Sequence, residues 1–317
     1  MGKFYTWPNP AFPFRLYFND PKCRIFIIHN LTHNYDWLRA AKDSIRSTDF
    51  FYVTLAWHFS DHLAKTGSIM FKELGLDINQ FHIMYNDLDE EIAGAQYGFR
   101  GEIINHNTWL DENIYKIRPE IEKIYDAIYI ARRSEMKRHF LAADIENLAL
   151  VAGGANHQNK ICNIPTSKND AALSLDAEGI SNILNASRVG LCLSETEGAC
   201  WSSSECLLSG VPVVSTHSQG GRSLWYNVNN SLIVEDSKAA VASGVQTIIN
   251  KNFDAASIRS EHVKKQNFFR DRFKSHLSST LSRFKVAIKV DEYFKDHFVD
   301  KMYTSLHLKE VLKTFGH

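Results

Sequence analysis

The stretch 193–235 decides the fold, and it reads LSETEGACWSSSECLLSGVPVVSTHSQGGRSLWYNVNNSLIVE. It begins at the end of an apolar run, continues with Glu197 and Gly198, and places Glu205 eight residues after Glu197. Gly210 then interrupts a helical pattern ahead of the next apolar run. We therefore predict a strand, a turn, a helix and a second strand. This order places Glu197 at the carboxyl edge of an open α/β sheet, where such sheets bind ligands.

Two carboxylates frame the turn and the helix of this stretch. Gly198 lets the backbone approach a ligand closely, and the helix start that follows offers free N–H groups and a positive dipole end, which favour a phosphate. Glu205 lies about two helical turns further on and can accept hydrogen bonds from the two hydroxyls of a ribose. We expect Glu197 and Glu205 to bind the sugars at the two ends of a diphosphate.

A diphosphate also needs cations, and a second strand end supplies them. The segment 131–137 reads ARRSEMK, and it ends one apolar run and begins a helical pattern. Arg132 and Lys137 are five residues apart across this turn, so both side chains can lie above the same sheet edge. In a site without a metal ion they would balance the charge of a leaving diphosphate.

Short apolar runs alternate with helical patterns along most of the chain, which predicts parallel sheets with helices on their faces. Residues 1–24 are rich in proline and aromatic residues and are expected to be irregular, and residues 236–317 are expected to hold helices only. The predicted strands are 24–28, 50–56, 81–85, 101–105, 127–131, 148–152, 190–193, 212–215 and 232–234. The predicted helices in the same part of the chain are 35–47, 62–74, 88–97, 134–144, 177–186 and 202–208.

The pattern restarts after a break near residues 108–119, where Arg118-Pro119 disfavours a helix. We therefore predict two Rossmann-like domains, residues 1–117 and residues 118–317, with the C-terminal helices in the second. Apolar residues at helical spacing in 268–284 indicate a core helix.

Several other functions lose support. No third glycine follows Gly153-Gly154 to complete a dinucleotide fingerprint, and no phosphate-binding G-K-S/T motif is present. Lys plus Arg number 36 and so do Asp plus Glu, a balance that argues against a dedicated nucleic-acid binder. From Arg259 onward there are thirteen basic and seven acidic residues, which is typical of a solvated helix face; weak peripheral contact with an anionic membrane is the alternative.

The cysteines indicate a reducing compartment. There are five, with no C-x-x-C pair, so neither a disulfide framework nor a zinc site is expected. The first residues show no apolar signal-peptide core, and no apolar run approaches the roughly 20 residues of a membrane helix. We therefore expect a cytoplasmic protein.

The second half of the chain resembles the group 1 glycosyltransferases, the retaining GT-B enzymes of the family 4 type. The resemblance rests on the order of five features within residues 100–235. These are the Arg-x4-Lys segment (Arg132 to Lys137), the Glu-x7-Glu motif (Glu197 to Glu205), Gly-Val-Pro-Val-Val (Gly210 to Val214), the paired glycine (Gly220-Gly221), and an Asn before a short strand (Asn230 to Val234). Residues 81–111 are similar to the last unit of a GT-B acceptor domain, and the first domain is shorter than usual.

The resemblance implies a GT-B fold with two domains facing across a cleft and a donor site in the second. Glu197 would contact the transferred sugar, Glu205 the ribose, and Arg132 and Lys137 the diphosphate. The backbone of 198–200 (Gly198, Ala199 and Cys200) would meet the distal phosphate, and Gly153 is also assigned to the donor site. Such enzymes typically retain anomeric configuration and need neither a metal nor another cofactor.

Three polar motifs of the first half have more than one interpretation. His58 follows a predicted strand; a histidine after a comparable strand of the family often lies by the donor sugar, and a buried or capping histidine is the alternative. His29 and His33 have ligand-like spacing but no evident third ligand, so a metal site is not expected. Asp87-Leu88-Asp89 looks like a metal-binding D-x-D motif, but acidic residues at a helix start favour the dipole anyway, and we adopt that interpretation.

Together these observations predict a metal-independent glycosyltransferase of polysaccharide biosynthesis. UDP is favoured as the nucleotide, with GDP next, and the acceptor is a glycan, a lipid-linked sugar or a protein. Two alternatives stay open: a GT-B phosphorylase or epimerase, and a non-catalytic module of the same fold that binds glycan or protein. The oligomeric state does not follow from the sequence.

Overall fold

The computed structural model describes residues 11–132, 134–152 and 176–317, which form two compact units. The first unit comprises the described residues up to Trp109 together with Asn267–His317, and the second is Leu110–Gln266. The sequence placed the division between residues 117 and 118 and assigned the C-terminal helices to the second domain. In the structure the second division falls inside helix α7 (Ala255–Arg283), so the residues after Gln266 group with the first unit.

The first unit is built on a six-stranded mixed sheet. Its strands lie in the order β11-β1-β2-β3-β4-β5. Strands β2 to β5 are parallel and follow one another in space as they do in sequence, whereas β1 is antiparallel to both of its neighbours. The bounds are β1 (Ala11–Asp20), β2 (Cys23–His29), β3 (Asp49–Thr54), β4 (Phe81–Tyr85), β5 (Arg100–Ile103) and β11 (Thr304–His307).

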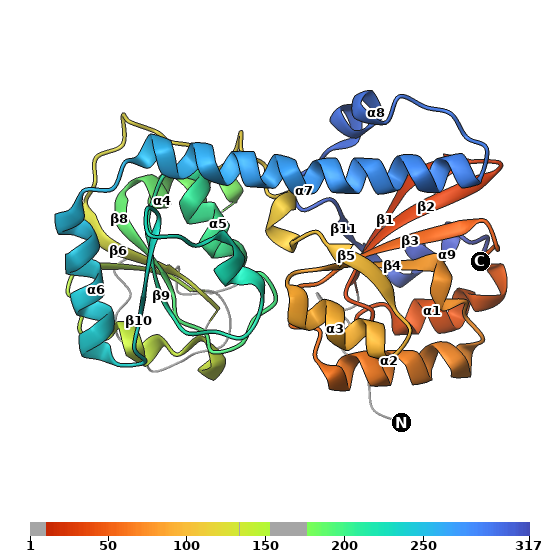
Figure 1. Cartoon of the computed structure of the whole chain (residues 1–317), viewed down its shortest axis with the longest axis horizontal. Coiled ribbons are helices and arrows are strands. Elements are labelled where there is room, and N and C mark those ends of the chain that lie inside the picture. Colours follow the sequence, from red (N-terminus) through yellow and green to blue (C-terminus); the bar gives the residue numbers. More distant parts are fainter. Residues whose placement is uncertain (1–10, 133, 153–175) are drawn as a thin grey trace. The chain divides into compact units, whose positions relative to one another are not determined.

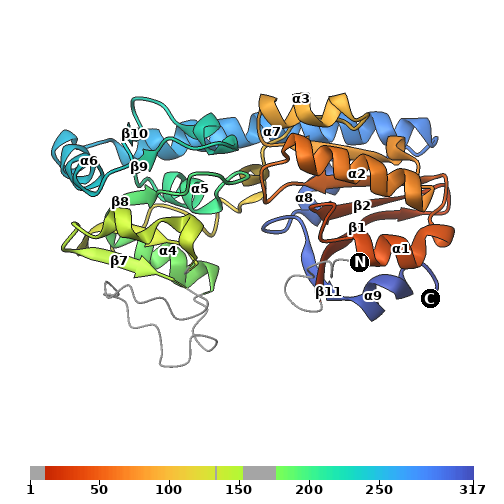
Figure 2. The same ribbon diagram turned by 90° about the horizontal axis from the view of Figure 1, so that it is seen from below.

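Three helices cover one face of this sheet because the connections between its parallel strands all advance in one direction. Right-handed crossovers then place every connecting helix on the same side, and α1 (Tyr35–Ala41), α2 (Asp61–Leu74) and α3 (Leu88–Gln96) lie there side by side (Figure 1, Figure 2). The Ser60 hydroxyl accepts a hydrogen bond at the start of α2, and Gly75 ends that helix with a φ of 68°, as its sequence pattern indicates.

Helix α7 covers the other face of the sheet with its C-terminal part. Alternate residues of β3 point to opposite faces: Phe51 belongs to the core beneath α1 to α3, and Tyr52 contacts α7. The Tyr52 ring meets the Phe273 ring edge to face, and its hydroxyl lies 2.8 Å from His276 Nδ1. None of the described helices, α7 included, combines the length and the apolar character needed to cross a membrane.

The prediction that residues 1–24 are irregular is wrong for residues 11–20, and a strand near the C-terminus was missed. β1 pairs with β2 on one side and with β11 on the other. Pro13, which argued against a strand, lies outside the part of β1 that pairs with β2 and opposite Ser305 of the short outer strand β11. β11 is short and mostly exposed, and only its pairing with β1 makes it a strand.

The second unit contains a five-stranded parallel sheet in the order β10-β9-β8-β6-β7. The chain moves outward from β6 to β7, then returns past β6 to β8 and continues in the opposite direction. This reversal places a topological switch point between β6 and β8. The bounds are β6 (Tyr125–Ile130), β7 (Leu148–Val151), β8 (Ser187–Cys192), β9 (Val213–Thr216) and β10 (Ser231–Val234).

The reversal also distributes the helices of the second unit over both faces of its sheet. Helices α4 (Ala177–Asn185) and α5 (Trp201–Leu208) belong to the crossovers in the direction of β10, and α6 (Lys238–Lys251) packs on the opposite face (Figure 1). The predicted helix at 134–144 is wrong. Two short 3-10 turns, Glu135–Lys137 and His139–Ala142, stand there, because Arg138 between them has a φ of 47° and turns the chain.

We expect His276 to make the first unit sensitive to acid. Burial lowers the pKa of His276 from 6.5 to about 4, with the neighbouring His82 acting in the same direction. The unfolded chain therefore binds this proton from pH 6.5 downward and the folded chain only near pH 4, so the free energy of unfolding falls as pH falls through this window. In His276→Gln the pH slope should be smaller by up to about 1.4 kcal/mol per pH unit.

Urea unfolding at several pH values, followed by the fluorescence of the buried Trp37 and Trp109, measures this slope. The exposed His62→Gln serves as the control. Equal slopes for wild type and His276→Gln would contradict the assignment.

Candidate functional site

The carboxyl ends of β6 and β8 bring together residues that the sequence singled out separately. Glu197 follows β8, and Lys137 follows β6. Because the topological switch lies between these two strands, their loops diverge to opposite sides and leave the edge open to a ligand. The carboxylate and one of the two predicted cations therefore lie at the same sheet edge.

Glu197 is held by two neighbours. The Lys137 ammonium lies 2.5 Å from Glu197 Oε1, and the Ser194 hydroxyl donates a hydrogen bond to the same oxygen. Burial alone would raise the pKa of Glu197, but Lys137, Ser194 and Arg222 outweigh it, and the pKa lies below its ordinary value. Glu197 is therefore an ionised acceptor whose position is fixed before any ligand binds.

The loop that carries Glu197 is fastened to the loop after β9 by backbone contacts. Gly221 N donates to Gly198 O at 2.7 Å, and Glu197 N donates to Gln219 O at 3.1 Å. Between these contacts Gly220 has a φ of 113°, and a Cβ added there would lie 1.7 Å from Glu197 O. Only glycine fits this close approach, which gives the paired glycine of the sequence a physical reason.

Arg138 was not singled out by the sequence, yet its guanidinium joins three strand ends. Nε donates to Leu193 O at 2.6 Å, Nη2 to Thr216 Oγ1 at 2.7 Å, and Nη1 to Asp236 Oδ2 at 2.7 Å. These partners follow or end β8, β9 and β10. A planar guanidinium with several fixed donors can satisfy them all at once. No feature of spacing distinguishes Arg138 from a surface arginine.

A second arginine lies below the edge and was also missed. Arg222 is 1% exposed, and its Nη2 donates to Thr216 O at 2.9 Å. Its Nε and Nη1 have no hydrogen-bond partner within the described part of the chain. The charge of Arg222 acts on Glu197 through space and contributes to lowering the pKa of that carboxyl.

The structure describes all but one of the remaining residues assigned to the donor site. Ala199 and Cys200 are buried, Cys200 has a φ of 58° at the start of α5, and Glu205 on α5 is 6% exposed. Arg132 is exposed, with Nη2 3.3 Å from Met136 Sδ. Gly153 lies outside the described residues.

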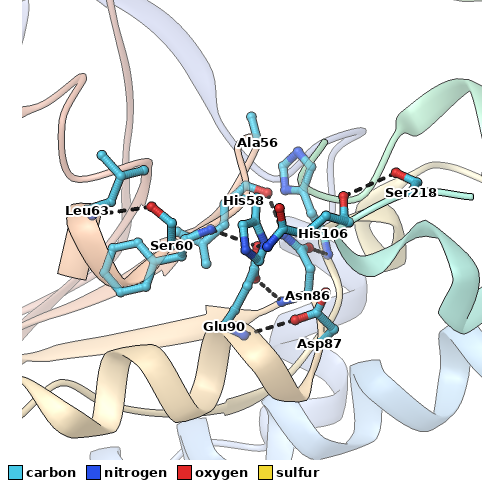
Figure 3. Close-up of polar contacts among 12 residues, drawn as sticks. Ala56, His58, Ser60, Leu63, Asn86, Asp87, Glu90, His106 and Ser218 are labelled. Carbon is cyan, nitrogen blue, oxygen red and sulfur yellow. Dashed lines mark hydrogen bonds and ion pairs between the residues drawn. The ribbon is translucent and has the colours of Figure 1, made fainter. Parts of the chain in front are cut away.

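A second polar edge lies at the carboxyl ends of the parallel strands in the first unit. Asn30, after β2, accepts from Ala56 N at 2.9 Å through its side chain, and Asn86 Nδ2, after β4, donates to Leu55 O at 3.0 Å. Asn86 Oδ1 also accepts from His106 N at 2.8 Å, after β5. Asparagine side chains thus link neighbouring loops. One of the linked loops is 55–60, which carries His58 (Figure 3).

The other polar motifs of the first unit have structural partners. The Asp87 side chain accepts from Glu90 N at 2.9 Å at the start of α3, which confirms the helix-start interpretation of Asp87-Leu88-Asp89. His29 is buried, with Nδ1 2.7 Å from Thr54 Oγ1. Across the described ranges, no three His, Cys, Asp or Glu side chains gather as metal ligands would.

Two Rossmann-like α/β units of this kind define the GT-B fold. No family model matches the chain, and no curated protein matches its sequence. Solved structures do match. HepE of Anabaena in complex with UDP is 14% identical, with a TM-score of 0.54 over 80% of this chain and 78% of that one.

Two further solved structures are similar over about half of their own length. TarM is 12% identical, with a TM-score of 0.54 over 78% of this chain and 53% of TarM. The pneumococcal O-GlcNAc transferase GtfA in complex with UDP and GlcNAc is 14% identical, with a TM-score of 0.52 over 78% of this chain and 54% of GtfA. These similarities confirm the GT-B fold expected from the sequence.

We expect Gly220→Ala to displace the Glu197 loop. The added Cβ would meet Glu197 O at 1.7 Å, and the positive φ of 113° adds strain. The variant should lose more than about 3 kcal/mol in the free energy of unfolding of the second unit, since strain and a backbone clash act together. Gly75→Ala is the matched control, because Gly75 has a φ of 68° and no atom within 4 Å of an added Cβ.

Gly75→Ala should cost only about 1–2 kcal/mol, the strain of the left-handed conformation alone. Urea unfolding of both variants measures the difference. Similar losses in the two would show that the close approach at Gly220 is not a constraint.

Proposed function

We propose that the protein is a glycosyltransferase that moves a sugar from a UDP-sugar to a hydroxyl of a glycan, lipid-linked or protein acceptor. The observation that carries the proposal is the Lys137–Glu197 ion pair at the switch point of the second sheet. A cation and a carboxylate fixed side by side are complementary to a sugar diphosphate, whose phosphates seek positive charge and whose sugar hydroxyls seek acceptors. HepE and GtfA, which share the fold, are described as complexes with UDP.

Each residue of the edge then has a role. Lys137 leaves Glu197 to neutralise the diphosphate, and Arg132, exposed at the end of β6, adds charge from the other side of the turn. Glu197, released from Lys137, accepts hydrogen bonds from the transferred sugar, and Glu205 binds the ribose. The backbone of 198–200 meets the distal phosphate at the start of α5.

Transfer proceeds with retention of configuration and without a metal ion. The leaving phosphate oxygen takes the proton from the acceptor hydroxyl on the same face of the sugar as the new bond forms. Lys137 and Arg132 stabilise the charge that grows on the departing diphosphate, which lowers the barrier most where that charge is largest. This chemistry belongs in the cytoplasm, where nucleotide sugars are supplied.

Binding of UDP, GDP, CMP and ADP by calorimetry tests the donor site. We expect micromolar binding of UDP that Lys137→Ala weakens at least tenfold, because the ammonium is lost from the diphosphate. Glu205→Gln should weaken UDP similarly, through the ribose. Lys251→Ala and Glu235→Gln, exposed positions of the same unit, are the controls and should bind as wild type does.

The nucleotide that binds names the donor base. Failure of all four nucleotides to bind the wild type would overturn the proposal and leave the non-catalytic module as the remaining interpretation. Binding without any transfer or hydrolysis of UDP-sugars would overturn the enzymatic part alone.

A further inference from the structure

Two cations act on Glu197, and the structure holds them in different ways. Lys137 contacts the carboxylate directly, and its side chain keeps an exposure of 17% at the open sheet edge. Arg222 is 1% exposed, and its Nη2 donates to Thr216 O at 2.9 Å. Its Nε and Nη1 find no hydrogen-bond partner among the residues that the structure describes. A buried guanidinium held in this way needs a compensating negative charge nearby.

Backbone contacts fix Arg222 close to Glu197. Arg222 follows Gly221, whose N–H donates to Gly198 O at 2.7 Å, and Gly198 in turn follows Glu197. Each charged residue is therefore one position away from the hydrogen bond that joins their loops. The close approach of Gly220 to Glu197 O holds the same two loops together. The place of Arg222 thus depends on backbone contacts that a ligand does not supply.

Glu197 is the carboxylate that compensates the charge of Arg222. The groups whose charges act on Arg222 are Tyr226, Cys200, Cys192 and Glu197. Phenols and thiols are protonated at neutral pH, and burial raises the pKa of Tyr226 further. The pKa of Glu197, by contrast, lies below its ordinary value. Arg222 and Glu197 therefore form a buried pair of opposite charges at the bottom of the candidate site.

The other titratable groups of the edge do not replace this pair. Burial raises the pKa of Tyr129 on β6, so that phenol is neutral. Arg138 forms an ion pair with Asp236. Burial acts to raise the pKa of Glu197, and Lys137, the Ser194 hydroxyl and Arg222 act against it.

We propose that Arg222 is a positioning residue that stays beside Glu197 when a diphosphate draws Lys137 away, and so keeps Glu197 ionised for the hydroxyls of the transferred sugar. The proposal rests on the proposed function, since it concerns the moment at which Lys137 turns to the donor. An ionised carboxylate accepts hydrogen bonds on both oxygens, whereas a protonated carboxyl donates with one of them. A buried carboxyl that lost its only cation beside incoming phosphates would take up a proton.

Two variants of Arg222 separate its charge from its packing. Arg222→Gln removes the charge and keeps an N–H donor for Thr216 O, and Arg222→Lys keeps both a charge and a donor. Both variants lose the guanidinium and its volume, so a difference between them reports the charge. Combining each with Lys137→Ala reproduces, without any ligand, the state in which Lys137 has left Glu197.

NMR titration of the glutamate carboxyl carbons gives the direct test, with Glu197→Gln to assign the signal. In the Lys137→Ala background, Arg222→Gln should raise the pKa of Glu197 by about one pH unit or more, the usual effect of losing a nearby opposite charge. Arg222→Lys should recover most of this shift. Arg188→Gln, which removes an exposed cation at the other end of β8, is the control and should leave the pKa of Glu197 unchanged. Equal shifts in Arg222→Gln and Arg222→Lys would overturn the proposal, because packing and not charge would then be responsible.

The wild type saturated with UDP gives a second test that needs no substitution of Arg222. We expect the carboxyl signal of Glu197 to stay at its ionised position at pH 7 when UDP binds. A shift of this signal to the protonated position would contradict the proposal. If UDP does not bind at all, the proposed function fails, while the titrations of the ligand-free variants still decide whether Arg222 sets the charge of Glu197.

Discussion

The carboxyl edge of a parallel sheet sets the constraint on which both units depend. Where the strands end, the backbone N–H and C=O groups lose their ladder partners, and any that stay buried must find others. A ligand site at that edge cannot be covered by further strands. The loops that follow the strands must therefore be held in place by side-chain hydrogen bonds and by close backbone contacts. The two units of this chain meet the requirement with different chemistry.

In the first unit two asparagines and the buried Glu90 carboxyl hold the loops in place, and in the second unit a guanidinium and a glycine do so. Asn30 and Asn86 bind backbone groups of the neighbouring loop, and Glu90 accepts from Phe59 N and Asn86 N. Arg138 binds three strand ends, and Gly220 lets two loops touch backbone to backbone. At the edge of the second sheet, the Lys137–Glu197 ion pair is then left as a charged pair beside these contacts.

The sequence predicted the local elements well, because their signals are local. β4 has the predicted bounds, and α2 ends at the glycine that marks its end. β11 could not be predicted, because it becomes a strand only through a partner some 290 residues away. β1 pairs with the neighbouring β2, but its proline-containing and aromatic-rich sequence shows no clear alternation. The same distinction between local signals and long-range contacts applies to the candidate site. The motif placed Glu197 at the end of a strand, but the contacts of Arg138 join three different loops and leave no trace in the spacing of the sequence.

The return of the chain to β1 has a consequence for the order of folding. The second unit has all of its residues once Gln266 has been synthesised. The first sheet, although it begins at residue 11, lacks its outer strand until Thr304–His307 emerge, and its core lacks Phe315, which stacks against Trp37 and Phe26. On the ribosome, therefore, the part synthesised first is completed last, and its apolar face needs shielding throughout translation.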